Sequence, residues 1–103
     1  MLKLALNPTF WAEVKVSIPG EKKPVVIKVK YRHRTVDEYK KFIEDLDGKT
    51  DFEILLELIE DWEGIDAPFN KENAELLIKH HHGICLEVFK VYGEEYAKAR
   101  IKN

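Results

Sequence analysis

Two segments near the start of the sequence alternate between apolar and polar residues, and they constrain the fold more than any other feature. Residues 12–18 read AEVKVSI and residues 25–31 read VVIKVKY. A period of two with many β-branched side chains is typical of half-buried strands. The intervening PGEKKP contains Gly20 and two prolines, which favour a turn. We therefore predict an N-terminal β-hairpin over about 11–18 and 25–31, with an apolar face that another layer must cover, because a lone hairpin is only marginally stable.

The remainder of the chain carries the signals of helices. Thr35 with Glu38, and Thr50 with Glu53, form capping boxes, in which two side chains satisfy unpaired backbone amides at a helix start. Asn70 is a further N-cap, and apolar residues recur at helical spacing after each of these starts. The predicted helices cover about residues 35–47, 51–63, 71–82 and 84–101. The fold class is therefore α+β, a hairpin followed by a bundle of about four helices, in one domain that spans residues 1–103.

The second predicted helix is expected to be the most buried, because apolar residues cover more than half of its circumference. It leads into the stretch LIEDWEGIDAPFNKEN, residues 58–73. Trp62 ends the predicted helix, and Phe69 precedes the Asn70 cap as a hydrophobic staple towards Ala74. We interpret this stretch as a structural corner that holds two helices at a fixed angle.

Charge is unevenly distributed along the chain, although the net charge is only −2. Residues 1–34 carry a net charge of +6, residues 35–66 carry −9, and residues 67–103 carry +1. Oppositely charged faces can attract each other within one fold. The alternative is head-to-tail or heterotypic association, in which complementary fields set the register and the association rate.

The composition is that of a folded protein, with 45% hydrophobic and 35% charged residues. Apolar runs stay far below the roughly 18 residues that span a membrane. The apolar run at the N-terminus is short and has no small-residue cleavage site, so we expect an intracellular protein. The single cysteine, Cys85, fits a reducing compartment.

Catalytic, metal-binding and nucleic-acid-binding interpretations have weak support. Three consecutive histidines in KHHHG point about 100° apart on a helix and cannot converge on one metal. The basic KVKYRHR, residues 28–34, places its lysines on the wet side of the hairpin, and an acidic segment follows it. DLDGKTDFE departs from a calcium-binding loop, and no nucleophile–histidine pair, phosphate loop or dinucleotide fingerprint is recognisable. We expect a protein without enzyme activity, cofactor, metal, nucleic-acid partner or membrane partner.

Five motifs follow one another along the chain: FWAEVKVSIPG in the first strand, YRHRT after the second, WEGID, FNKENAELL, and ARIKN at the end of the last helix. In this order they resemble the small tail assembly chaperones of tailed bacteriophages, from about Phe10 to Asn103. The resemblance implies a hairpin-plus-helix fold and a non-catalytic factor in the bacterial host cytoplasm. It further implies binding to the tape-measure protein, recruitment of tail-tube subunits and absence from the mature virion. Many members are also made as a longer frameshifted product, and the family offers no catalytic residues to carry over.

A protein that holds an apolar client needs exposed apolar or adaptable surface. The chain has five Phe, four Tyr and two Trp residues, and the same side chains would also suit a well-filled core. The candidate protein-binding residues are Phe52, Leu55, Ile59, Trp62, Phe69, Phe89, Tyr92 and Tyr96. Two other functions stay open: a structural tail or connector component retained in the virion and, less favoured, a nucleic-acid-binding regulator that uses Lys28, Lys30 and Arg32. Self-association into a homo-oligomer also stays open.

Overall fold

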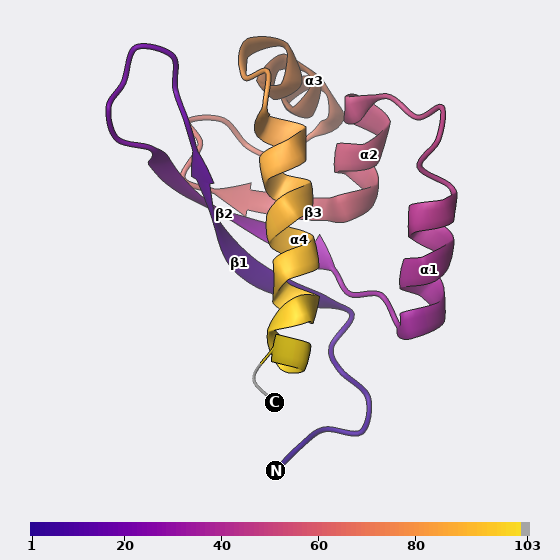
Figure 1. Ribbon diagram of the computed structural model, residues 1–103. Coiled ribbons are helices and arrows are strands. Elements are labelled where there is room, and N and C mark those ends of the chain that lie inside the picture. The colour runs from indigo at the N-terminus through magenta and orange to yellow at the C-terminus, as the bar shows by residue number, and fades with distance from the viewer. Residues whose placement is uncertain (102–103) are drawn as a thin grey trace.

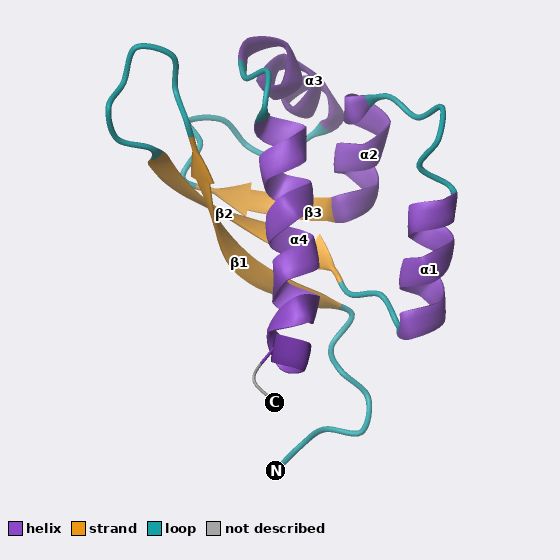
Figure 2. Cartoon of the chain, in the orientation of Figure 1, coloured by secondary structure: helices purple, strands orange, loops and turns teal. Residues whose placement is uncertain are grey.

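The computed structural model describes residues 1–101, with side chains through Lys98, and shows a three-stranded antiparallel sheet with helices packed on one face (Figures 1 and 2). Lys102 and Asn103 of the ARIKN motif lie outside the described residues. The strands follow the order β1-β2-β3 across the sheet. In chain order the elements are β1 (Thr9–Val16), β2 (Val25–Arg32), α1 (Val36–Glu44), α2 (Asp51–Leu58), β3 (Ile59–Glu63), α3 (Lys71–His80) and α4 (Ile84–Ile101).

The predicted hairpin is confirmed, with β1 and β2 paired antiparallel so that Val14 lies opposite Ile27 and Ala12 lies opposite Val29. Val14, Val16, Ile27, Val29 and Tyr31 of the apolar side are buried and Ala12 is half-buried, whereas Val25 at the loop end of β2 is exposed. Glu13 and Lys28 on the other face are exposed. Helix α4 lies across the apolar face (Figure 1). It supplies the covering layer that the alternation of the hairpin requires.

The predicted helix over 51–63 is wrong in its last turn, because residues Ile59–Glu63 form the strand β3, and α2 ends at Leu58. The strand pairs antiparallel with β2, but Lys30 lies opposite Asp61 and Tyr31 lies opposite Ile59, so one residue bulges out of register. A bulge shifts the alternation of a strand by one position. Ile59 and Trp62 therefore both face the core although they are three residues apart. That spacing gave the sequence the appearance of a helical stripe.

The helix starts agree with the sequence, since Thr35 and Thr50 form complete capping boxes and the Asn70 side chain accepts from the N–H of Asn73. The helix ends are earlier than expected. Helix α1 stops at Glu44, before the predicted residue 47, and α3 stops at His80, before residue 82. After α1 the chain tightens into a turn in which the N–H of Leu46 donates to the carbonyl of Ile43.

Two tyrosines tie α4 to the centre of the sheet. The Tyr31 hydroxyl donates to the carbonyl oxygen of Val88 at 2.7 Å, and the Tyr92 hydroxyl donates to the carbonyl oxygen of Arg32 at 2.8 Å. Both rings are fully buried, with centroids 5.2 Å apart. Because each buried hydroxyl has a partner, the aromatic core costs little in unsatisfied polar groups.

The corner at residues 62–70 joins a strand to a helix rather than two helices. The indole N–H of Trp62 donates to the carbonyl of Ala67 at 2.7 Å, and the ring packs edge-to-face on Phe69 at 5.0 Å. Gly64 has a φ of 88°, and a Cβ there would lie 3.4 Å from the backbone of Ile27. The turn therefore depends on a glycine, and its two aromatics pack on each other.

Candidate functional site

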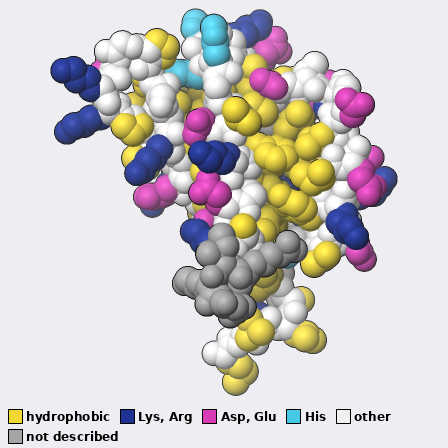
Figure 3. Space-filling view, viewed as in Figure 1, with side chains coloured by type: hydrophobic (Ala, Val, Ile, Leu, Met, Phe, Trp, Pro, Cys, Tyr) yellow, Lys and Arg dark blue, Asp and Glu magenta, His cyan; other side chains and the backbone are white. Residues whose placement is uncertain are grey.

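An apolar surface is left open between α1 and α4. Figure 3 shows hydrophobic side chains gathered between α4 and the helices α1 and α2. Val36 is 73% exposed, Ile43 40% and Leu86 71%, and three neighbouring aromatic side chains are half-buried. We call this set the α1–α4 face: Val36, Tyr39, Ile43, Leu86, Phe89 and Tyr96.

The helical spacing of both elements produces this face. Val36, Tyr39 and Ile43 recur at steps of three and four along α1, as do Leu86, Phe89 and Gly93 along α4. Aromatic contacts hold α1 in place, among them the stacking of Phe42 on Phe89 at 6.0 Å and the edge-to-face contact of Tyr39 with Tyr96 at 5.2 Å. A Cβ at position 93 would lie 3.6 Å from the Tyr39 hydroxyl, an ordinary contact distance, so the Tyr39 side chain reaches α4 at Gly93.

An open cavity of about 890 Å³ lies at one end of the α1–α4 face. Its walls include Val36, Tyr39, Gly93 and Tyr96 from the two helices. The rest of the lining consists of residues 4–6 near the N-terminus, residues 33–35, Lys40 and Ala97. A mostly apolar hollow of this size can take several side chains of another protein.

Arg34 links the helices α1, α2 and α4 beneath this face. Its guanidinium donates to the Tyr92 hydroxyl at 3.1 Å and to the carbonyl oxygen of Glu57 at 2.7 Å, in the last turn of α2. The same group lies 4.0 Å over the ring of Phe42. A cation at the C-terminal end of a helix satisfies an unpaired carbonyl and opposes the negative end of the helix dipole. The sequence placed Arg34 in a basic stretch and gave no sign of this role.

Buried hydroxyl and thiol groups around the core stay protonated. Burial raises the pKa of Tyr31 well above its ordinary value, and burial with a hydrogen bond to Tyr96 does the same for the pKa of Tyr92. Burial beside Asp51 raises the pKa of the Cys85 thiol to about 11. The thiol donates to the carbonyl of Asp51 at 3.5 Å and is therefore a packed side chain rather than a nucleophile.

The eight candidate protein-binding residues separate into two groups. Leu55, Ile59, Trp62 and Tyr92 are buried in the core, where a client has no access to them in this conformation. Phe52, Phe69, Phe89 and Tyr96 are half-buried, and of these Phe89 and Tyr96 belong to the α1–α4 face. Val36, Ile43 and Leu86 of the α1–α4 face were not among the candidates. Their signal was an apolar residue at the margin of each buried helical stripe.

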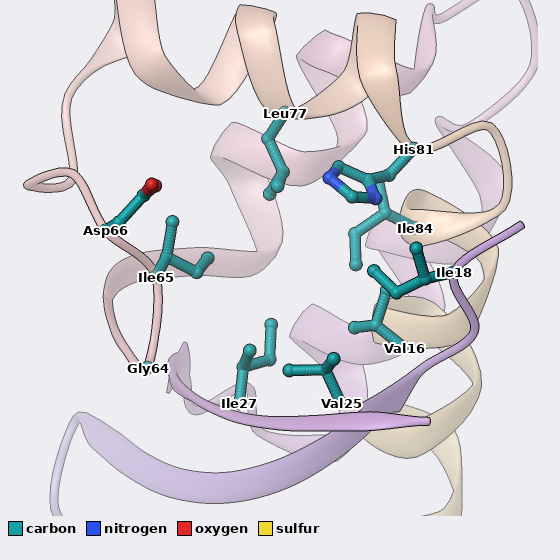
Figure 4. A pocket seen from close by; sticks show the side chains of 10 residues that line it. All are labelled: Val16, Ile18, Val25, Ile27, Gly64, Ile65, Asp66, Leu77, His81 and Ile84. Atoms are coloured by element: carbon teal, nitrogen blue, oxygen red, sulfur yellow. The ribbon is translucent and has the colours of Figure 1, made fainter. Parts of the chain in front are cut away.

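A second cavity, of about 360 Å³, lies between the hairpin, the loop after β3 and the junction of α3 with α4 (Figure 4). We call it the hairpin pocket. The imidazole of His81 is directed into it, and the buried Nδ1 atom has no hydrogen-bond partner among the described residues. The pocket is lined by Val16, Ile18, Val25, Ile27, Gly64, Ile65, Asp66, Leu77, His81 and Ile84.

The basic residues of β2 lie beside acidic residues of the same sheet. Glu60 in the bulge of β3 pairs with Arg32 at 3.0 Å and with Lys30 at 3.6 Å. Lys28 lies between Glu13 and Glu63 in the strand register. Part of the charge asymmetry therefore acts within the fold, which weakens the nucleic-acid interpretation.

Over the described part of the chain, no group of three or more His, Cys, Asp or Glu side chains is placed to hold a metal ion. The three consecutive histidines, residues 80–82, do not lie on one helix as the sequence suggested. Helix α3 ends at His80, and the backbone of His81 is extended. Within the same residues, no helix has the length and apolar character needed to cross a membrane.

Comparison with known proteins bears on the whole chain. A model of the phage tail assembly chaperone family matches residues 1–103. Comparison with curated proteins and with solved structures gave no match. The match agrees with the resemblance carried by the order of the five motifs. The chain therefore belongs to the phage tail assembly chaperone family.

Proposed function

We propose that this protein is a non-catalytic chaperone that binds the tape-measure protein through the α1–α4 face. It also helps recruit tail-tube subunits, acts in the bacterial host cytoplasm and is absent from the mature virion. Family membership supports the general role. The observation that carries the proposed binding surface is the apolar face left open between two helices, with a large cavity at one end.

The α1–α4 face suits a client segment that forms an amphipathic helix. Such helices insert side chains at steps of three and four residues into apolar grooves. The two rows of apolar side chains on α1 and α4 have matching spacing. Phe89 and Tyr96 supply rigid aromatic anchors, which often dominate the energy of protein interfaces. A tape-measure protein is long, and its apolar helices would aggregate without a partner.

Co-expression with the tape-measure protein tests this proposal. Leu86→Asp places a charge on an exposed position of the α1–α4 face, so we expect client co-purification to fall at least about tenfold. Leu76→Asp is the matched control, because Leu76 is also exposed (47%) but lies on α3 outside the face. Equal client solubility with wild type, Leu86→Asp and no chaperone would contradict the proposal.

Mass spectrometry of purified virions tests the absence from the particle. A chaperone that leaves during assembly is expected to be missing from purified particles and abundant in infected lysates. Detection in a fixed ratio to the tail-tube protein would instead support a retained tail or connector component.

A further inference from the structure

The N-terminal arm, residues 1–6, is the most exposed apolar segment of the described chain. Leu2 is 89% exposed, Leu4 105% and Leu6 60%. These leucines alternate with Lys3 and Ala5, so the arm would present them on one side once it straightens at the bend that the structure has at Leu4 and Ala5. Exposed apolar surface that is contiguous in this way marks an interaction site more often than isolated exposed residues do.

The hairpin pocket has a lining that suits a leucine-rich arm. Its walls are aliphatic, with Val16, Ile27, Leu77 and Ile84 among them. His81 Nδ1 has no partner, and a backbone N–H of an extended arm is a suitable donor for it. In Figure 4 the Asp66 carboxylate lies across the pocket from His81.

The charges of the arm and the pocket are complementary. The arm contains one cation, Lys3, and no acidic residue. Asp66 is exposed at the pocket and can pair with this lysine. When the leucines of the arm enter the hairpin pocket, Lys3 can therefore pair with Asp66.

The arm cannot reach the pocket of its own chain with Leu4 or Leu6. The arm joins β1 at Thr9, whereas Val16 at the other end of β1 lines the pocket. At about 3.3 Å per residue, the two ends of this strand are separated by about 23 Å. Leu4 extends at most about 18 Å from Thr9. Figure 1 likewise shows the N-terminus at the end of the molecule opposite the hairpin loop and α3.

We infer that the hairpin pocket of one copy of this chain binds the leucine-rich arm of a second copy. Each copy carries one arm and one pocket at opposite ends, so the contact is head-to-tail and leaves a free pocket and a free arm for the next copy. This self-association uses a different pocket from the proposed client binding, although the arm also lines the cavity at one end of the α1–α4 face.

Sedimentation over a range of concentrations tests the inference. We expect the average mass of the wild type to rise with concentration. Leu4→Asp in the arm and Val25→Asp in the pocket should each give a monomer, because both substitutions put a charge into the contact. Val26→Asp is the control, since Val26 is as exposed (47%) as Val25 (44%) but does not line the pocket.

Mixing the two defective variants gives the sharpest result. Leu4→Asp retains an intact pocket and Val25→Asp retains an intact arm, so an equal mixture should form a heterodimer that does not grow further. Reversing both charges, in the double variant Lys3→Glu with Asp66→Lys, should restore the association that either single reversal weakens. A wild type that stays monomeric at every concentration, or a loss of association in Val26→Asp equal to that in Val25→Asp, would overturn the inference.

Discussion

Among single residues, Arg34 connects three separate helices of the molecule. Its side chain meets α2 at Glu57, α1 at Phe42 and α4 at Tyr92, and its own backbone N–H donates to the Tyr96 hydroxyl at 2.9 Å. No local sequence pattern indicates such a role, because Glu57 and Tyr92 lie 23 and 58 residues away along the chain. The capping residues Thr35, Thr50 and Asn70 were predictable for the opposite reason. Their partners lie three residues away.

Replacement of Arg34 should therefore lower stability strongly. Arg34→Ala removes two charge-assisted hydrogen bonds and a cation–π contact, and we expect the free energy of unfolding to fall by about 2–4 kcal/mol. Arg34→Lys should recover only part of this, since an ammonium lacks the planar fork. Urea denaturation measures both. Arg32→Ala, which breaks an exposed ion pair with Glu60, should cost less than about 1 kcal/mol. Equal losses in the two alanine variants would contradict this role.

At the scale of elements, the comparison of sequence with structure separates local from non-local signals. The hairpin was predictable because its alternation and its turn are both local. Strand β3 was not, because its bulge is a property of its pairing with β2. The α1–α4 face was predictable only in part. Helical periodicity identifies an apolar stripe, but the distance between α1 and α4 decides how much of it is covered.

The turn after β3 offers a test at this scale. Gly64→Ala places a side chain at a φ of 88°, close to the backbone of Ile27, and we expect a loss of about 1–2 kcal/mol in unfolding free energy. Gly93→Ala is the comparison within a helix. It meets ordinary contact with Tyr39 and gains helix propensity, so it should be neutral or stabilise by up to about 1 kcal/mol. Thermal denaturation of both variants measures these changes in stability. Effects of the same sign would contradict this assignment of the two glycines.

The whole molecule holds its helical layer on the sheet largely through aromatic packing and buried hydroxyls. Within the sheet, acidic β3 lies beside basic β2, and Glu60 of β3 forms an ion pair with Arg32 of β2. Charge asymmetry along the sequence was visible without a structure. That the two segments are neighbours in one sheet was not visible, because the sequence indicated a helix where β3 is found.

The buried tyrosines make alkaline stability a property of the whole fold. Burial raises the pKa of Tyr31 and Tyr92 above the ordinary value near 10, so the unfolded chain loses these protons first. Above about pH 10 the unfolded state binds fewer protons than the folded state, and unfolding free energy should fall by about 1.4 kcal/mol per pH unit for each tyrosine. Below that pH this contribution is fully present. Urea denaturation between pH 8 and 11 measures the slope. Tyr31→Phe should be less stable at pH 8 but have a shallower alkaline slope; an unchanged slope would argue against this origin.

Hydrogen exchange of the protein alone and in complex with the tape-measure protein locates the client-binding surface. We expect that complex formation protects backbone amides of α1 and of residues 84–97 in α4, with little change in the β1–β2 hairpin. Protection concentrated in that hairpin, with α1 and α4 unchanged, would contradict the assignment of the α1–α4 face as the client-binding surface.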